Sequence, residues 1–314
     1  MDLKHLEYII AIAEEKNISR AADKLYMSQP TLSQYLLKLE QDIGVCLFNR
    51  IKNALTLTYA GEIYVQAAKE ILNTKKQTSN IIEDIIDYKK GHIIIGVAPD
   101  RGATILPSVI PKFLEKYPGI KIDLVEENAK QLETLTLQGH IDFTIAVYYA
   151  QEIQLDYEFL CSEEIILAVP KSHRLAHLAA NAIPGKKPVV DLLLFKDDPF
   201  VLMKHGTKIR QITDNIFKDA GFSPNIILES GSINTIQYMA ANNAALSILP
   251  EKFFNYPAIG DNLVYFSINP EKYYWPIIAT FRKNNYLTRA AKDFISILKS
   301  YLNSTSPLLK VEPK

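Results

Sequence analysis

The chain has 314 residues, and the usual size of a folding domain predicts about two domains for that length. Hydrophobic residues make up 48% of the sequence and charged residues 22%, with 35 basic and 35 acidic side chains, which excludes disordered and collagen-like chains. No apolar run approaches the roughly 18 residues of a membrane-spanning helix, and the N-terminal residues lack the pattern of a signal peptide. We therefore expect a cytoplasmic protein with no membrane partner.

The cysteine, histidine and glycine residues give no pattern of a catalytic or metal site. Cys46 and Cys161 lie far apart in the sequence and outside any C-x-x-C pair, so we expect both to be small buried apolar residues. The six histidines lack the spacing of metal ligands, and the twelve glycines form no GxGxxG, P-loop or GxSxG motif. The sequence therefore predicts a protein that is not an enzyme and that uses no metal and no cofactor.

Near the N-terminus, helical patterns recur with capping residues at several starts. Apolar residues at helical spacing predict a helix over residues 3–15. We expect Ser19 to cap a second, short helix and Ser28 to cap a third, with a short turn at Tyr26 and Met27 between the two. Two short helices joined in this way predict a helix-turn-helix.

The third helix has one apolar and one polar face. Its leucines recur at helical spacing and supply the core, so the opposite face points outward. Glutamine amides can hydrogen-bond to base edges, adenine first, and serine and lysine side chains suit phosphate oxygens. A helical bundle with a solvated polar face is the alternative. The residues on this face are Gln29, Pro30, Ser33, Gln34 and Lys38.

The segment that follows the third helix, residues 48–58, alternates apolar and polar residues around a turn. This pattern predicts a small β-wing that carries Arg50 and Lys52 to the DNA. Basic residues exceed acidic ones over residues 16–58, which favours a nucleic-acid partner for this part of the chain.

Several short motifs in this region resemble the winged helix-turn-helix of LysR-type transcriptional regulators. In chain order they are Asn17-Ile18-Ser19-Arg20-Ala21-Ala22, Met27-Ser28-Gln29-Pro30-Thr31-Leu32-Ser33, Leu39-Glu40, Gly44-Val45, Leu47-Phe48-Asn49-Arg50 and Leu57-Thr58-Tyr59-Ala60-Gly61. The resemblance implies a sequence-specific transcriptional regulator, with a double-stranded DNA operator as its partner and RNA polymerase as a further partner. It adds three residues to the expected DNA contacts, Arg20, Ser28 and Thr31.

Three positions of the third helix depart from the family pattern. Gln34 and Leu37 stand where the family often has Arg or Lys, and Tyr35 is an aromatic residue. Fewer cationic side chains on this helix mean fewer phosphate contacts, so we expect DNA binding that is weaker or depends less steeply on salt.

Residues 59–90 predict one long linker helix. Thr58 can cap its start, Gly91 lies just past its end, and isoleucines recur along it at three- and four-residue spacing. A second copy of the helix would cover this apolar stripe, and packing against the rest of the chain is the alternative. The resemblance implies a homodimer through this helix and a homotetramer through the C-terminal domains.

From His92 onward, strands and helices alternate in two similar halves. The order βαβαβ in each half predicts a parallel sheet with helices on both faces, and hence two subdomains with a cleft between them. Asn128 and Gln131 resemble a capping box. The expected strands are residues 92–98, 120–125, 141–147, 199–203, 226–228 and 245–249, and the expected helices are residues 104–117, 128–139, 207–220 and 232–241.

A strand over residues 273–281 and a helix over residues 288–302 are expected to return to the first half. Two crossings, near residues 162 and 268, would make a hinge that can close on a ligand. This matches the effector domain of the LysR type, which resembles type 2 periplasmic binding proteins. The predicted fold is therefore an α+β multidomain chain with a winged helix-turn-helix DNA-binding domain (1–58), a linker helix (59–90), a two-lobed α/β effector domain with lobe 1 (91–161 plus 269–303) and lobe 2 (162–268), and a C-terminal tail (304–314).

Ligands of open parallel sheets bind beyond the carboxyl ends of the strands, where helix N-termini supply free amide hydrogens. The loops at these positions match the effector crevice of the family. Four basic side chains in them favour an anionic small-molecule effector such as a carboxylate: Arg101, Lys204, His205 and Lys208. Asp100 argues the other way and can cap its own helix. The alternatives are a regulator with an empty crevice and a small-molecule enzyme on the two-lobed fold. The expected effector contacts are Asp100, Arg101, Gly102, Ala103, Thr104, Asn128, Val147, Lys204, His205, Gly206, Thr207 and Ser232.

Overall fold

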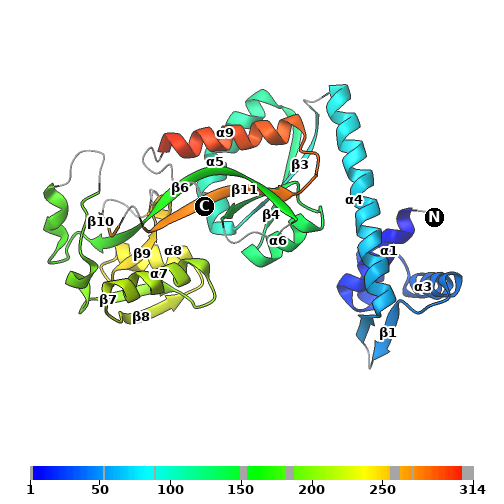
Figure 1. Cartoon of the computed structure of the whole chain (residues 1–314), viewed down its shortest axis with the longest axis horizontal. Helices are drawn as coiled ribbons and strands as arrows, with labels where there is room; N and C mark the ends of the chain where they lie inside the picture. Colours follow the sequence, from blue (N-terminus) through cyan, green and yellow to red (C-terminus); the bar gives the residue numbers. More distant parts are fainter. Residues whose placement is uncertain are drawn as a thin grey trace. The chain divides into compact units, whose positions relative to one another are not determined.

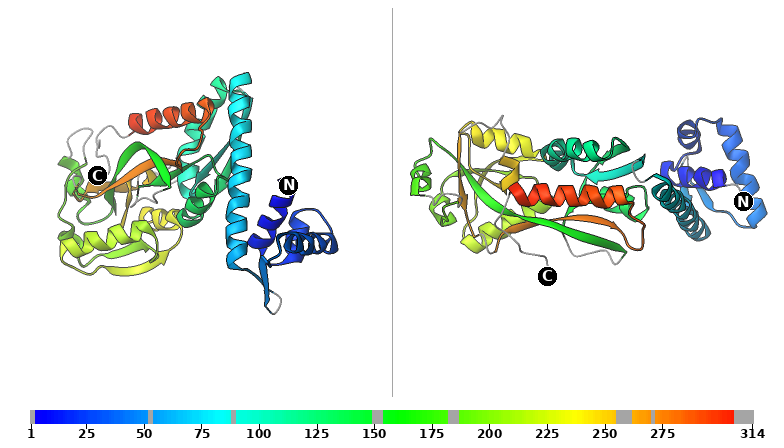
Figure 2. Two further views of the ribbon diagram at one scale, coloured as in Figure 1. Left: turned by 45° about the vertical axis from the view of Figure 1, so that its right-hand side comes forward. Right: turned by 90° about the horizontal axis from the view of Figure 1, so that it is seen from above.

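The computed structural model describes residues 3–51, 54–87, 90–148, 154–181, 187–254, 262–269 and 272–305. The chain forms two compact units, Met1–Tyr88 and Lys89–Lys314. Figure 1 and Figure 2 show the ribbon of both units from three directions.

The N-terminal unit is a winged helix-turn-helix that continues into a long helix (Figure 1). Leucines and isoleucines at helical spacing form its core, and two alanines in the second helix let the third approach closely. The buried residues of this core include Leu6, Ile9, Ile12, Ala21, Ala22, Leu32 and Leu36. Its elements are α1 (Leu3–Glu15), α2 (Ile18–Lys24), α3 (Gln29–Ile43), β1 (Phe48–Ile51), β2 (Ala54–Leu57) and α4 (Tyr59–Asp87).

The caps of α2 and α3 fix the turn between them. Asn17, not Ser19, caps α2: its Oδ1 accepts a hydrogen bond from the backbone N–H of Arg20 at 3.1 Å. The prediction for Ser19 is wrong because Ser19 already lies inside the helix, whereas a cap must precede the amides it accepts from. Ser28 caps α3 as predicted, and its Oγ accepts from the backbone N–H of Thr31 at 3.3 Å.

The first turn of helix α4 packs closely against the backbone of Leu47. Its predicted cap is confirmed, since the Oγ1 of Thr58 accepts a hydrogen bond from the backbone N–H of Gly61 at 3.0 Å. A Cβ at Gly61 would lie 2.0 Å from the carbonyl oxygen of Leu47, so only glycine fits there. Val65 and Ala68 are buried in the core of the unit. The first isoleucine of the predicted stripe, Ile63, is not part of this core and is 55% exposed.

The C-terminal unit is built of strands and helices that mostly alternate along the chain (Figure 1). Its first half holds β3 (Lys90–Val97), α5 (Pro99–Lys116), β4 (Gly119–Glu126), α6 (Ala129–Leu137), β5 (Phe143–Val147) and β6 (Leu155–Pro170). Its second half holds the 3-10 helices η1 (Ala176–Asn181), η2 (Leu192–Phe195) and η3 (Glu251–Phe254), with β7 (Pro199–Met203), α7 (Lys208–Ala220), β8 (Asn225–Ser230), α8 (Ile233–Ala241) and β9 (Ser247–Pro250). The last elements are β10 (Leu263–Ser267), β11 (Tyr274–Arg282) and α9 (Arg289–Thr305).

The parallel strand pairs lie within the predicted βαβ units. β3 pairs in parallel with β4 and β5, and β7 pairs in parallel with β8, as expected. β11 pairs antiparallel with both β5 and β6, and β6 pairs antiparallel with β9 and β10. The larger sheet therefore has the order β10-β6-β11-β5-β3-β4, with β9 also paired to β6.

Helices cover both faces of the first subdomain's sheet, as predicted. A Cβ at Gly96 of β3 would lie 3.1 Å from the Cδ2 of Leu132 on α6. A Cβ at Gly102 of α5 would lie 3.0 Å from the Cγ1 of Val97, the next residue of β3. Because successive residues of a strand point to opposite faces, α5 and α6 lie on opposite sides of β3. α9 packs beside α5.

The long strand β6 belongs to both subdomains. Its first part pairs with β11 from Leu155 to Glu164, and its last part pairs with β9 and β10 from Ile165 to Pro170. The register with β11 shifts between Ile277 and Ile278, just before this change of partner. The sequence pattern predicts a crossing here but no strand.

Two further expectations are wrong. α5 begins at Pro99 rather than at Thr104, because proline tolerates the first turn of a helix, where its missing amide hydrogen leaves no helical bond unmade. The residues expected to form a loop are therefore the first turns of α5. Cys46 is exposed, whereas Cys161 is buried as predicted. Burial raises the pKa of the Cys161 thiol to about 11, so this cysteine is a thiol at neutral pH.

Candidate DNA-binding surface and effector-binding region

Helix α3 presents the predicted polar face. Leu32 and Leu36 are buried, and Gln29, Gln34 and Lys38 on the other side are exposed. The sequence pattern alone was sufficient to find this face, because apolar residues at three- and four-residue spacing fix which side of a helix is buried.

The first turn of α3 is held by its own hydroxyl groups. The Oγ of Ser28 and the Oγ1 of Thr31 lie 2.7 Å apart in a hydrogen bond, and both side chains are exposed. Pro30 is exposed in the same turn, and Ser33 is half-buried. The expected contacts of this turn thus lie together at one end of the helix.

Tyr35, one of the departures from the family pattern, packs within the N-terminal unit. Its ring centroid lies 4.3 Å from that of His5 and 5.3 Å from that of Tyr8, both on α1. This aromatic residue therefore joins α3 to α1, a role that its local sequence does not reveal.

Basic residues of α2 lie against the end of α1. A terminal nitrogen of Arg20 donates to the carbonyl oxygen of Glu15 at 2.5 Å, so part of this guanidinium satisfies the C-terminus of α1. Lys24 donates to Glu14 at 3.1 Å, and that hydrogen bond raises the pKa of Lys24. On the wing, Arg50 is placed opposite Leu55 in the strand register. The side chain of Arg50 and the whole of Lys52 lie outside the described residues.

In the effector-binding region, Asp100 links the two subdomains. Its carboxylate accepts a hydrogen bond from the backbone N–H of Ile233, the first residue of α8. Burial raises the pKa of Asp100, and this hydrogen bond opposes the shift. Ser232 caps the same helix, with its Oγ accepting from the backbone N–H of Thr235 at 3.3 Å. The carboxylate of Asp100 is therefore bonded to one of the α8 amides at which the sequence predicts an anionic effector.

Arg101 does not present a free positive charge to a ligand. Its side chain is buried, its Nη1 donates to the Oε1 of Glu163 on β6 at 2.5 Å, and its guanidinium lies 4.6 Å from the ring centroid of Phe253. The expectation that Arg101 attracts an anion is corrected by this contact, since its charge is already compensated. Glu163 lies 62 positions further along the chain, so no local signal could have found the pair.

Most of the remaining expected residues of the first subdomain take part in packing or hydrogen bonding within that subdomain. Gly102 packs on β3, and the Oγ1 of Thr104 donates to the backbone carbonyl of Asp100 at 2.7 Å. The Oδ1 of Asn128 caps α6 by accepting from the backbone N–H of Gln131 at 3.1 Å. Ala103 is exposed, and Val147 is half-buried against the core.

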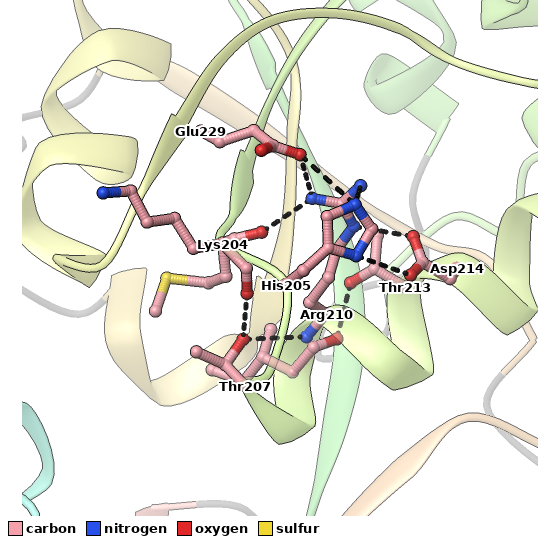
Figure 3. A network of polar contacts seen from close by, with 9 residues as sticks. Lys204, His205, Thr207, Arg210, Thr213, Asp214 and Glu229 are labelled. Carbon is pink, nitrogen blue, oxygen red and sulfur yellow. Dashed lines mark hydrogen bonds and ion pairs between the residues drawn. The ribbon is translucent and has the colours of Figure 1, made fainter. Parts of the chain in front are cut away.

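The loop from Lys204 to Thr207 is held by a polar network around Arg210. Arg210 is not among the residues expected from the sequence pattern. Figure 3 shows His205, Asp214 and Glu229 around the buried guanidinium of Arg210. The Nε of Arg210 donates to Asp214 at 2.6 Å, and its Nη2 lies 2.8 Å from the Nε2 of His205. His205 is thus held among two carboxylates and a guanidinium. The spacing of Arg210 and Asp214, four residues apart on a helix, was the available signal.

The start of α7 is also well defined. The Oγ1 of Thr207 accepts from the backbone N–H of Arg210 at 3.3 Å and donates to the carbonyl oxygen of Lys204 at 3.0 Å (Figure 3). Gly206, between them, has a φ of 91°, which favours glycine. Lys208 follows as the first residue of α7, and burial lowers the pKa of its ammonium group, opposed by the charge of Glu133 on α6. The negative charge of Glu133 in the first subdomain therefore acts on Lys208 in the second.

Among the described residues, no group of three or more His, Cys, Asp or Glu side chains lies close enough to hold a metal ion. None of the helices in the described ranges combines the length and apolarity needed to cross a bilayer.

Two family models match consecutive parts of the chain. The model described as "Bacterial regulatory helix-turn-helix protein, lysR family" matches residues 3–62. The model described as "LysR substrate binding domain" matches residues 87–303.

Relatives and solved structures agree with these matches. The uncharacterized HTH-type transcriptional regulator YwbI of Bacillus subtilis (strain 168) is 31% identical over 314 residues, covering 96% of this chain and 97% of that protein. AlsR of the same organism, an HTH-type transcriptional regulator, is 29% identical over 302 residues and is covered to 95%, as is this chain. Full-length OxyR from Pseudomonas aeruginosa, as a variant, has a TM-score of 0.71 at 22% identity, with 100% of this chain and 99% of that chain covered. CbnR in complex with its target DNA has a TM-score of 0.61 at 22% identity, with 96% and 99% covered. The chain therefore belongs to the LysR family of DNA-binding transcriptional regulators, with an N-terminal helix-turn-helix and a C-terminal effector-binding domain.

Proposed function

We propose that the exposed face of α3 reads operator DNA in the major groove. The observation that carries this proposal is the division of α3 into a buried leucine face and an exposed face with Gln29, Gln34 and Lys38. Glutamine amides suit base edges, and the lysine suits a phosphate. The other proposed contacts are Arg20, Ser28, Pro30, Thr31, Ser33, Arg50 and Lys52.

Selection of bound sequences from a pool of random duplexes tests this proposal with the full-length protein. We expect a near-palindromic motif whose half-sites are separated by about one turn of DNA or a multiple of it, because a two-fold dimer presents two recognition helices. No enrichment over the starting pool at moderate ionic strength would show that the proposal is wrong.

We further propose that two copies of α4 form a homodimer. The isoleucines in the second part of the helix are exposed, with Ile85 at 75% and Ile86 at 78%. A matching helix would cover them with the same apolar stripe. Homotetramer formation through the effector domains and contact with RNA polymerase complete the assembly that we propose.

A small anionic effector is proposed to bind between the lobes, at the start of α7 and α8. Helix N-termini supply amide hydrogens and positive partial charge, and Lys204 and Lys208 add ammonium groups there. Because Arg101 and His205 already lie against carboxylates of the protein, the proposal depends on these amides and the two lysines. The remaining proposed contacts are Asp100, Gly102, Ala103, Thr104, Asn128, Val147, Gly206, Thr207 and Ser232.

Asp100 gives this effector a competitor inside the protein. An anion that binds the first turn of α8 must compete with the carboxylate of Asp100 for the amide of Ile233. Displacement would release one link between lobe 1 and lobe 2. We propose the lobe boundaries near residue 162, close to the point where β6 changes partner from β11 to β9 and β10, and near residue 268, just after β10. An effector that prefers one lobe arrangement by about 1–3 kcal/mol would change operator affinity about 5- to 150-fold.

A thermal-shift screen of small carboxylates on the full-length protein tests the effector proposal. A ligand that binds only the native state stabilises it by about 2.7 kcal/mol at a hundred times its dissociation constant. No shift with anions, together with intact operator binding, would favour the ligand-independent regulator. Turnover of a small molecule would favour the enzyme.

A further inference from the structure

Tyr26 ends α2 in a backbone conformation that favours glycine. Its φ is 54°, in the left-handed region. Its backbone N–H donates to the carbonyl oxygen of Asp23 at 3.1 Å, and the N–H of Met27 donates to that of Ala22 at 3.0 Å. This pair of hydrogen bonds defines a Schellman motif, in which the left-handed residue is usually glycine, or sometimes asparagine, because a Cβ is crowded there.

Within the described ranges, three other helices end with the same pair of hydrogen bonds. The left-handed residue is Gly139 after α6, Gly221 after α7 and Asn243 after α8, with φ values of 75°, 78° and 61°. In these three motifs the chain uses the residues that tolerate the conformation best. A tyrosine in the fourth motif is therefore unfavourable for folding.

The side chain of Tyr26 offers no packing that would offset this. It is 98% exposed and makes no hydrogen bond or ring contact with the part of the chain that the structure describes. Tyr35 of α3 shows the contrast, because its ring packs on the rings of His5 and Tyr8. The stability of the N-terminal unit thus gives no reason for a tyrosine at position 26.

The position of Tyr26 supplies a reason. It lies in the turn of the helix-turn-helix, two residues before Ser28, which caps α3. Tyrosine hydroxyls are among the groups that donate to phosphate oxygens and so set the register of a protein on the duplex. We propose that the Tyr26 hydroxyl donates a hydrogen bond to a DNA phosphate beside the recognition helix. This inference rests on the proposed function of α3 and adds a contact to it.

Fluorescence anisotropy with a labelled random-sequence duplex tests the inference, because a phosphate contact does not depend on sequence. We expect Tyr26→Phe, which lacks only the hydroxyl, and Tyr26→Gly to bind roughly tenfold more weakly than the wild type, as for the loss of one hydrogen bond to a charged group. The slope of log affinity against log salt should stay unchanged, because a neutral hydroxyl displaces no counterion. Lys38→Ala should instead flatten that slope.

Thermal melting of the variants controls for an effect of the substitutions on folding. Tyr26→Gly should melt at the same temperature as the wild type or a few degrees higher, since glycine tolerates the left-handed backbone. Asn243→Gly changes the same kind of position in the other unit and should leave DNA affinity unaltered. The inference is wrong if Tyr26→Phe binds as tightly as the wild type, or if both variants lose affinity together with a change in oligomeric state by light scattering. A wild-type protein that binds no duplex at all would overturn the proposed DNA reading itself.

Discussion

Arg101 and Glu163 form an ion pair that is almost entirely removed from water, with exposed fractions of 6% and 0%. The cost of desolvating two charges offsets much of their attraction, so such a pair stabilises little by itself. Removing one partner, however, leaves an uncompensated buried charge. The two residues are therefore better tested together than singly.

We expect Arg101→Met to lower the free energy of unfolding of the effector domain by about 3–5 kcal/mol, and the double change Arg101→Met with Glu163→Gln to recover most of that loss. Urea denaturation of the full-length protein measures both. Lys116→Met removes a partner of the exposed pair Lys116–Asp293 and should cost less than about 1 kcal/mol. Equal losses in the single and double variants would contradict the account of Arg101.

Asp100 predicts a pH-dependent difference in stability. Burial raises the pKa of its carboxyl group, so the folded state binds this proton more tightly than the unfolded chain does. Its contribution therefore favours folding below the ordinary aspartate pKa of about 4 and is lost as the pH rises through the raised pKa. Asp100→Asn keeps an acceptor for the amide of Ile233 but does not ionise.

The gain in unfolding free energy of Asp100→Asn over the wild type should accordingly grow from acid pH to neutral pH. Urea melts of both proteins across that range measure it, and the difference cancels the titration of all other groups. A constant difference at every pH would show that Asp100 is not the titrating group.

Within helix α3, we expect Lys38 to contact a phosphate and Gln29 to contact a base, so substitutions at the two positions should have different effects on DNA binding. Lys38→Ala should weaken binding to all duplexes and reduce the salt slope by about one phosphate's worth, roughly 0.9. Gln29→Ala should instead relax the preference at one base position, with little change in the salt slope. Anisotropy titrations over a salt series and selection from random duplexes measure the two effects. An unchanged consensus for Gln29→Ala would show that this glutamine does not read bases.

Elements with local signals could be predicted from the sequence, and those with distant partners could not. Ser28 and Leu32 mark α3 through a cap and a buried face, which depend only on neighbours within a few residues. β6 was missed because Glu163 and Glu164 interrupt its apolar pattern, and these glutamates are buried in the fold by partners far away in the sequence. The contact of Arg101 with Glu163 and that of Asp100 with Ile233 join residues that only the tertiary fold brings together, so no sequence spacing indicates them. For the same reason, the compensation of the Arg101 charge by Glu163 could not be predicted.

For the whole molecule, the uncovered part of α4 predicts that assembly depends on apolar contact. Ile85→Asp would place a charge at a side chain that is 75% exposed in the single chain and, in the proposed dimer, buried by the partner helix. We expect the variant to sediment as a monomer at concentrations where the wild type is a dimer, and to lose affinity for paired half-sites. Val189→Asp changes another exposed apolar residue, in the effector domain, and should leave the dimer intact. A dimeric Ile85→Asp protein would show that the helix pairs elsewhere.

The continuity of β6 determines how the two lobes can move. Its 16 residues make a strand about 50 Å long that stays paired on both sides of the point where its neighbours change. A flexible loop would let the lobes swing freely, whereas a paired strand can only absorb their rotation as additional twist shared among several residues. The register shift at Ile277 and Ile278 is where such twist concentrates most easily. The effector domain should therefore respond to ligand by a limited, graded torsion.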